Sequence, residues 1–126
     1  MDIRDNLLYT KDHEWVDISD NKIKIGITDF AQGELGDIIF VELPNTESSV
    51  TKGESAATIE AVKTVADVYT PISGKIIEVN TLVEDTPELI NSSPYDDGWI
   101  VTIESDESID SNDFLSANQY KEFIGI

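Results

Sequence analysis

The chain has 126 residues, a length that fits one domain with a single hydrophobic core. Its 26 acidic residues outnumber its 8 basic residues, so the formal net charge is −18 at pH 7. Such a surface repels nucleic acid and anionic lipid, and the longest apolar run, Ile38 to Val41, is too short to span a membrane. Cysteine is absent, so any sulfur chemistry must arrive on a cofactor.

The first residues predict no targeting segment. Charged side chains follow Met1 at once, and strand-like sequence begins near Tyr9. We therefore expect the chain to stay in the compartment where it is made, the cytoplasm. The mitochondrial matrix would apply only to a mature, processed chain.

Strand patterns dominate the chain. Apolar residues alternate with polar ones, or form short β-branched runs, in five segments: Glu14 to Ile18, Lys22 to Ile27, Asp37 to Leu43, Gly74 to Asn80 and Trp99 to Ile103. Turn residues separate these segments. Short strands at this spacing favour a sandwich or barrel over a parallel sheet with crossover helices.

Two short helices are predicted between the strands. Thr28 can cap a helix from Asp29 to Leu35, with Gly36 as its left-handed stop. Thr86 can cap a turn whose first helical residue is Pro87.

The clearest helix signal lies near the C-terminus. Ser116 and Gln119 have the spacing of a capping box. The residues that follow, Tyr120, Phe123 and Ile124, give the helix an apolar side that could close one end of the sandwich.

Lys63 is a lone cation in a small, apolar stretch. Gly53 and Gly74 lie almost evenly on either side of it, which is compatible with a lysine at a bend between two strands. No Asn-Gly or Asp-Gly pair marks a tight hairpin there, so local rules leave the turn ambiguous. A lysine that simply points to water from a strand is the alternative.

The chain resembles the H-protein family of the glycine cleavage system from end to end. The resemblance rests on ordered matches such as His13-Glu14-Trp15-Val16, Phe40-Val41-Glu42-Leu43-Pro44, Glu60-Ala61-Val62-Lys63, Pro71-Ile72-Ser73-Gly74 and Pro87-Glu88-Leu89-Ile90-Asn91. Ala61 and Thr64-Val65 depart from the family's usual residues but leave the lysine in place. The resemblance implies one lipoyl-carrier domain over residues 1–126. It also implies a mainly β, lipoyl-domain-like barrel-sandwich hybrid of two antiparallel sheets with short flanking helices, one of them C-terminal.

The resemblance further implies lipoate in amide linkage to Lys63, on a protein that carries a group rather than catalyses a reaction. The implied partners are the glycine decarboxylase (P protein), the aminomethyltransferase (T protein), dihydrolipoamide dehydrogenase (L protein) and the lipoylating enzymes. The carrier would take the aminomethyl group of glycine from the first to the second, and the third would reoxidise it.

Three acidic residues are candidates beside Lys63. Glu60, three residues earlier, could be part of what the lipoylating enzyme recognises, or it could be an ordinary exposed carboxylate on a strand. The resemblance also implies a surface cleft for the loaded arm, and Glu14 and Asp67 occupy matching positions, where a carboxylate could hydrogen-bond the amine. Both could also be acids that face solvent.

His13 is the only histidine, and without a nearby nucleophile it is expected to pack beside Trp15 rather than act as a base. Trp15, Trp99, Phe40 and Tyr95 are expected in the core or at its ends.

Four alternatives stay open at this point. The chain could be a lipoyl or biotinyl domain of another complex, but the methionines and flexible linkers usual there are missing. It could relay lipoyl groups to other complexes. It could be a structural sandwich that is never modified. No motif for a nucleophile, base or phosphate cradle supports an enzyme.

Overall fold

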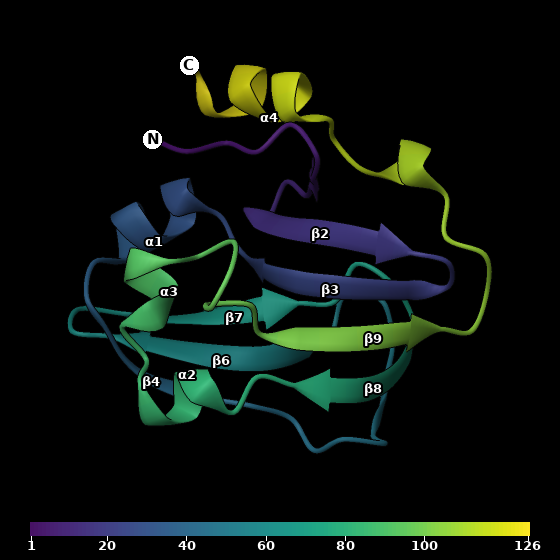
Figure 1. Ribbon diagram of the computed structural model, residues 1–126, viewed down its shortest axis with the longest axis horizontal. Helices are drawn as coiled ribbons and strands as arrows, with labels where there is room; N and C mark the ends of the chain where they lie inside the picture. Colours follow the sequence, from purple (N-terminus) through teal and green to yellow (C-terminus); the bar gives the residue numbers. More distant parts are fainter.

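The computed structural model describes residues 1–126 as two antiparallel sheets packed around one core, with helices at the ends (Figure 1). The larger sheet has six strands in the order β1-β2-β3-β9-β8-β5. Its strands are β1 (Leu8–Tyr9), β2 (Glu14–Ser19), β3 (Lys22–Ile27), β5 (Ser49–Val50), β8 (Gly74–Val79) and β9 (Val101–Ser105).

The smaller sheet carries the hairpin that was ambiguous in the sequence. Its order is β4-β6-β7, with β4 at Ile38–Glu42, β6 at Ser55–Ala61 and β7 at Val65–Tyr69. Its inward side chains include Val41 and Ile59, both 1 % exposed. These side chains pack in one cluster with Ile25 and Ile103 of the larger sheet, so apolar burial between the two sheets holds them together. The predicted two-sheet, mainly β fold is confirmed.

The first predicted helix is confirmed in its bounds. In α1 (Asp29–Leu35), the Thr28 hydroxyl accepts a hydrogen bond from the Ala31 N–H at 3.1 Å. Gly36 ends the helix with φ of 80° and ψ of −156°, a conformation open to glycine but different from the predicted left-handed helical one.

The helix predicted after Thr86 is wrong in its start. Thr86 is the C-cap of an unpredicted helix, α2 (Leu82–Asp85), and α3 begins two residues after Pro87, at Leu89–Ser92. The Thr86 side chain caps neither helix, although its carbonyl accepts the Leu89 N–H at 3.1 Å. Because α2 and α3 have only four residues each, neither shows a helical period in the sequence.

The C-terminal helix α4 (Ala117–Ile124) follows a short 3₁₀ turn at Ser111–Asp113 and has the predicted capping box. Tyr120 is fully buried and stacks on Tyr9 with ring centroids 4.7 Å apart. A second apolar cluster thus forms beneath α4, at one end of the molecule: Leu7, Tyr9, Trp15, Tyr95, Ala117 and Tyr120.

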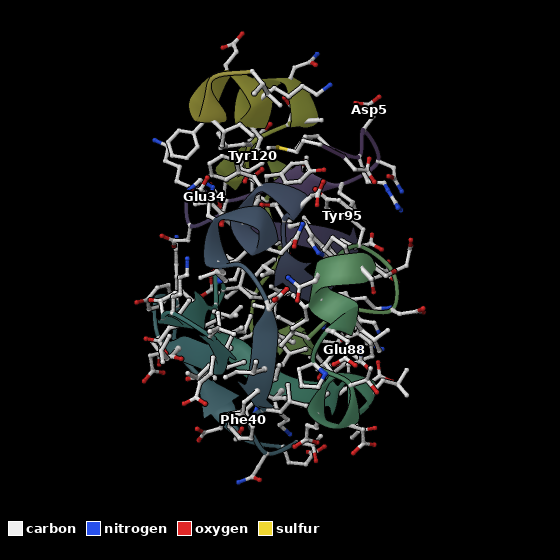
Figure 2. The ribbon with its side chains drawn as sticks, turned by 90° about the vertical axis from the view of Figure 1, so that its left-hand side faces the viewer. Asp5, Glu34, Phe40, Glu88, Tyr95 and Tyr120 are labelled. Carbon is white, nitrogen blue, oxygen red and sulfur yellow. The ribbon has the colours of Figure 1, made fainter.

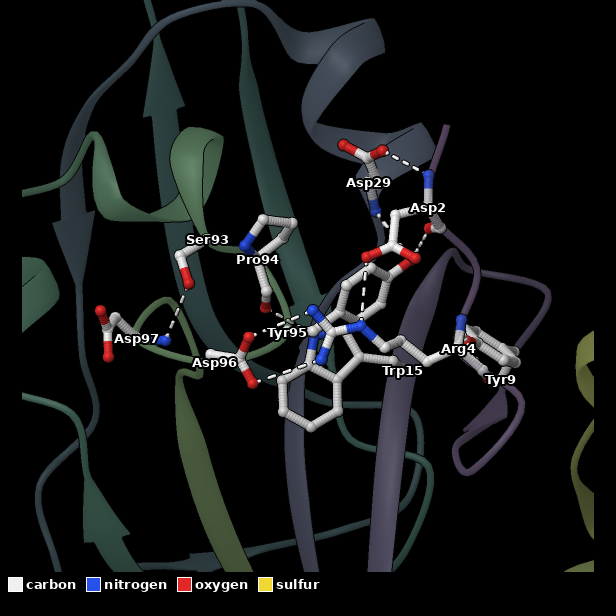
Figure 3. Close-up of polar contacts among 10 residues, drawn as sticks. All are labelled: Asp2, Arg4, Tyr9, Trp15, Asp29, Ser93, Pro94, Tyr95, Asp96 and Asp97. Carbon is white, nitrogen blue, oxygen red and sulfur yellow. Dashed lines mark hydrogen bonds and ion pairs between the residues drawn. The ribbon is translucent and has the colours of Figure 1, made fainter.

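Polar contacts fasten the N-terminal segment over this cluster (Figure 3). Arg4 reaches Asp96 with N–O distances of 3.1 and 3.3 Å, and its guanidinium lies 5.1 Å from the centre of the Tyr95 ring. The Tyr95 hydroxyl donates to the Asp2 carbonyl at 2.6 Å, and the Trp15 indole N–H donates to the Pro94 carbonyl at 2.8 Å. These bonds join segments more than 75 residues apart in the sequence.

Replacement of Ser116 by alanine is expected to lower the free energy of unfolding by about 1 kcal/mol, because the Gln119 N–H loses its acceptor. Urea unfolding measures this loss. Asn118→Ala, an exposed change within the same helix, should alter stability much less. Equal losses in the two variants would contradict a specific role for the cap.

Candidate lipoyl-lysine tip and arm cleft

Lys63 lies in the turn between β6 and β7, where it is exposed to solvent. The Ala61 N–H donates to the Thr64 carbonyl at 2.8 Å and closes the turn. The Val62 N–H donates to the Asp37 carbonyl at 3.1 Å, which braces the turn against the residue before β4. Lys63 takes part in none of the three ion pairs, so its amine is presented to solvent on a backbone held at two points.

This turn needs no unusual backbone conformation. The only non-glycine residues with positive φ are His13, Asp20 and Glu47, so Val62 and Lys63 both have negative φ. Tight two-residue hairpins usually need positive φ, which explains the Asn-Gly signal expected of them. The signal is missing here because the turn does not require it.

Glu60 lies on the outer face of the smaller sheet, within three residues of Lys63. It pairs with Phe40 on one side and Val65 on the other, and its side chain is partly exposed. Antiparallel partners that face each other share one face of the sheet, so Glu60 stands between two exposed apolar side chains.

Glu14 is buried rather than solvent-facing, with 1 % of its surface exposed. One carboxyl oxygen accepts from the Thr10 hydroxyl at 3.0 Å, and the other accepts from the Tyr69 N–H at 2.8 Å. No cation pairs with it. Burial without a counter-charge raises the pKa of Glu14 to about 8, although both hydrogen bonds favour the ionised form.

Asp67 is exposed, and its carboxylate is held on the outer face of the sheet. One oxygen accepts from the hydroxyls of Ser55 and Thr58, both at 3.1 Å. The backbone of Asp67 belongs to β7, which is an edge strand. Asp67 is therefore accessible to a ligand both at its exposed carboxylate and along the unpaired edge of β7.

A cleft of about 330 Å³ includes both Glu14 and Asp67 in its walls. Ala66 and Asp67 lie only three and four residues beyond Lys63, roughly 10–13 Å along a strand. Apolar side chains make up most of the remaining wall: Ile27, Phe30, Ala31, Leu35, Ile59 and Val68. Three further polar residues border it: Asp12, His13 and Glu34.

His13 borders this cleft but does not pack beside Trp15, so that prediction is wrong. Its ring lies 5.0 Å from Phe30 and 5.7 Å from Phe123, and its Nδ1 is 2.9 Å from the Tyr120 hydroxyl. Burial lowers the pKa of His13. His13 has a positive φ of 66° just before β2, and its ring contacts come from α1 and α4 instead.

The aromatic predictions have mixed outcomes. Trp15 and Tyr95 are buried as expected, and Trp99 is partly buried with the Lys24 amine 4.9 Å from its ring. Phe40 is 49 % exposed, so the expectation that it lies in the core or closes one of its ends is wrong. A bulge between Ile38 and Phe40 breaks the alternation of β4 and turns both Ile39 and Phe40 outward.

A larger cavity of about 710 Å³ also includes Glu14 in its walls, together with its hydrogen-bond partners Thr10 and Tyr69. Its walls include Gly53 and Ser73, which flank the hairpin at the end opposite Lys63. The smaller cleft is thus the one within reach of a chain attached to Lys63.

A scan against protein-family models matches residues 7–125 to the glycine cleavage H-protein model. The chain belongs to the glycine cleavage H-protein family. Similar proteins include the glycine cleavage system H protein of Staphylococcus carnosus, 48 % identical over 99 % of both chains. That of Listeria monocytogenes serotype 4a is 52 % identical over 98 % of this chain and 99 % of the relative.

A solved structure gives the same result for the fold. The glycine cleavage system H protein of Mycobacterium marinum has a TM-score of 0.90 and 38 % sequence identity, over 98 % of this chain and 100 % of that one. Members of the H-protein family are the lipoyl carriers of the glycine cleavage system and hold lipoate covalently on a lysine. They interact with the P, T and L proteins of that system. No helix of this H-family chain is long and apolar enough to cross a membrane.

Proposed function

We propose that Lys63 is the residue that carries lipoate, and that this chain takes the aminomethyl group of glycine from the P protein to the T protein and is then reoxidised by the L protein. The observation that carries the proposal is the position of Lys63, exposed and unpaired at the braced turn of the β6–β7 hairpin. A side chain at a hairpin tip can enter a deep active site, whereas one on the flat of a sheet cannot.

The residues present fit a lipoyl group on Lys63. The lysine side chain alone spans about 6 Å by standard bond lengths. A lipoyl chain in amide linkage extends this reach toward the cleft that begins three residues along β7. The apolar wall suits its methylene groups, and the carboxyl groups suit an amine at its end.

When bound, lipoate supplies a ring disulfide that accepts the aminomethyl group and is reduced as it does so. The role of this chain is to bind the aminomethyl group on the arm and to shield it from water. In this proposal, the carboxyl groups of Glu14 in the wall and of Asp67 at the edge of the sheet turn toward the amine when the arm enters, and the wall around Phe30 and Leu35 excludes water. An ammonium in the cleft favours the ionised form of Glu14, so the arriving cation displaces the proton that burial keeps there.

The chain catalyses no reaction of its own in this proposal. The tip offers a lysine but no general base beside it, and the only histidine lies against aromatic rings at the cleft. The proposal places the single carrier domain in the cytoplasm.

Glu60 serves as part of what the lipoylating enzyme recognises, because it lies on the exposed face next to the turn.

Peptide mapping of protein purified from its native host tests the assignment. We expect a lipoyl adduct on Lys63 and on none of the other six lysines. An adduct elsewhere, or none although other lipoyl proteins of that host are modified, would overturn it. A relay of lipoyl groups to other complexes remains the second candidate. It would appear as transfer of labelled lipoyl groups from this chain to their lipoyl domains.

A further inference from the structure

Four exposed apolar side chains surround the turn that carries Lys63. Ile39 is 56 % exposed, Phe40 49 %, Val62 66 % and Val65 60 %, and they make up four of the nine large apolar residues that the fold leaves exposed. Strand pairing brings them together. Phe40 and Val65 pair with Glu60 from either side, so the three stand in one row across the sheet. Ile38 pairs with Ala61, which places the next residues, Ile39 and Val62, near the same turn. We call these four residues the tip collar.

The tip collar is built into the fold. The bulge in β4 exposes Ile39 and Phe40 in succession where a regular strand would bury one of them. Figure 2 shows Phe40 at the end of the molecule opposite α4 and Tyr120, away from the aromatic cluster at that end. Exposed apolar residues gathered at one place on a protein with net charge −18 indicate a surface that another protein covers.

We propose that the tip collar is the docking surface for the enzyme that acylates Lys63 with lipoate. This inference rests on the proposed function. The P, T and L proteins act on the sulfur end of the arm, a full arm length beyond the Lys63 nitrogen, so the turn needs to reach only the mouth of each of their active sites. The acylating enzyme must instead bring its reacting carbon to the lysine nitrogen, about 6 Å from the backbone by standard bond lengths. Its surface must therefore cover the residues next to Lys63.

The acylation step requires the acyl carbon to come within bonding distance of the Lys63 nitrogen. The neutral Lys63 amine attacks the acyl carbon of a lipoyl adenylate and forms the C–N bond. The carbon–oxygen bond to AMP breaks, AMP leaves with its electron pair, and the amine gives up one proton. Burial of Phe40 and Val65 against the enzyme aligns the amine for this attack, as apolar anchors at the centre of an interface do.

Charge around the tip collar limits the partner further. Glu60 stands within the row of Phe40 and Val65, Glu42 and Asp67 occupy the next row on the same face, and Asp37 braces the turn. No basic side chain other than Lys63 lies among these residues. The covering surface is thus expected to be apolar at its centre and basic at its rim.

The test follows lipoylation of the unmodified protein by a purified lipoate ligase supplied with lipoate and ATP, with intact mass as the readout. Phe40→Ala and Val65→Ser are each expected to lower kcat/KM about tenfold. Phe40→Leu should restore most of the rate, because it keeps an apolar anchor. Phe123→Ala, which truncates a 46 % exposed aromatic on α4, is the matched control and should react at the wild-type rate.

Further measurements separate the outcomes. An adduct that persists in Lys63→Arg would overturn the proposed function, whereas wild-type rates in Phe40→Ala and Val65→Ser, with Lys63 still modified, would overturn the tip collar alone. Fully lipoylated Phe40→Ala should have a wild-type KM with the L protein. A raised KM there together with unchanged lipoylation would contradict the choice of partner. Self-association of the wild-type chain that Phe40→Ala abolishes, seen by sedimentation, would contradict it too.

Discussion

Replacement of Lys63 by arginine is expected to abolish glycine cleavage in a mixture reconstituted with the P, T and L proteins. The guanidinium stays protonated and cannot be acylated, so no arm forms. The side chain is exposed and unpaired, and the charge is kept, so the free energy of unfolding should change by less than about 0.5 kcal/mol. Glycine-dependent release of carbon dioxide measures the activity.

Lys52→Arg is the matched control for this change. Lys52 is an exposed lysine beside Gly53, at the other end of the same hairpin, and its replacement should leave cleavage at the wild-type rate. Appreciable activity in Lys63→Arg would show that another lysine can carry the arm. A large loss of thermal stability would instead show that Lys63 is part of the packing.

Replacement of Glu14 by glutamine is expected to stabilise the protein at alkaline pH. The pKa of Glu14 is raised to about 8 in the folded state, above its ordinary value of 4.5, so the folded state binds more protons than the unfolded state between these limits. The contribution of Glu14 to stability is therefore full below about pH 4.5, is lost progressively as the pH rises toward 8, and is gone above that. By pH 9 the advantage of Glu14→Gln should be on the order of 5 kcal/mol.

Denaturant unfolding at pH 5, 7 and 9 measures this difference. The two proteins should be about equally stable at pH 5 and diverge as the pH rises. Glu42→Gln, which removes an exposed carboxylate on β4, should follow the wild type apart from a constant offset. Parallel curves for the wild type and Glu14→Gln would mean that water or a cation neutralises the buried group.

Glu14→Gln also tests the cleft. With lipoylated protein loaded by the P protein, Glu14→Gln and Asp67→Asn should each release formaldehyde and ammonia several times faster than the wild type, because each weakens a charge-assisted hydrogen bond to the amine. Lipoylation itself should proceed normally. Unchanged release in both variants would remove these two residues from the proposed arm site.

The strands and the helix caps were predictable where local chemistry determines them. Alternating isoleucines indicate β3, and Ser116 with Gln119 indicates the start of α4. By contrast, β5 has two residues and α2 has four, too few to show a period. The exposure of Phe40 follows from a bulge set by pairing with β6, which no local pattern in β4 reveals.

In the candidate site, too, some features could be predicted from neighbouring residues and others depend on residues far away in the sequence. The position of Lys63 follows from the residues around it together with the family resemblance. The hydrogen bonds to buried Glu14 come from Thr10 and from Tyr69, a residue 55 positions away, and the surroundings of His13 come from residues 30, 120 and 123. Contacts over such distances arise from the packing of the two sheets, and a single sequence does not display them.

The negative φ values of the Val62–Lys63 turn have a consequence for variation in the family. A turn with positive φ reserves its positions for glycine, asparagine or aspartate, and any other residue there costs stability. This turn makes no such demand, because the Asp37 carbonyl and the Ala61–Thr64 bond hold its shape. The residues on either side of the lysine are thus free to diverge from one carrier to another. Each carrier's tip can therefore adapt to its own set of enzymes without any change in the scaffold beneath it.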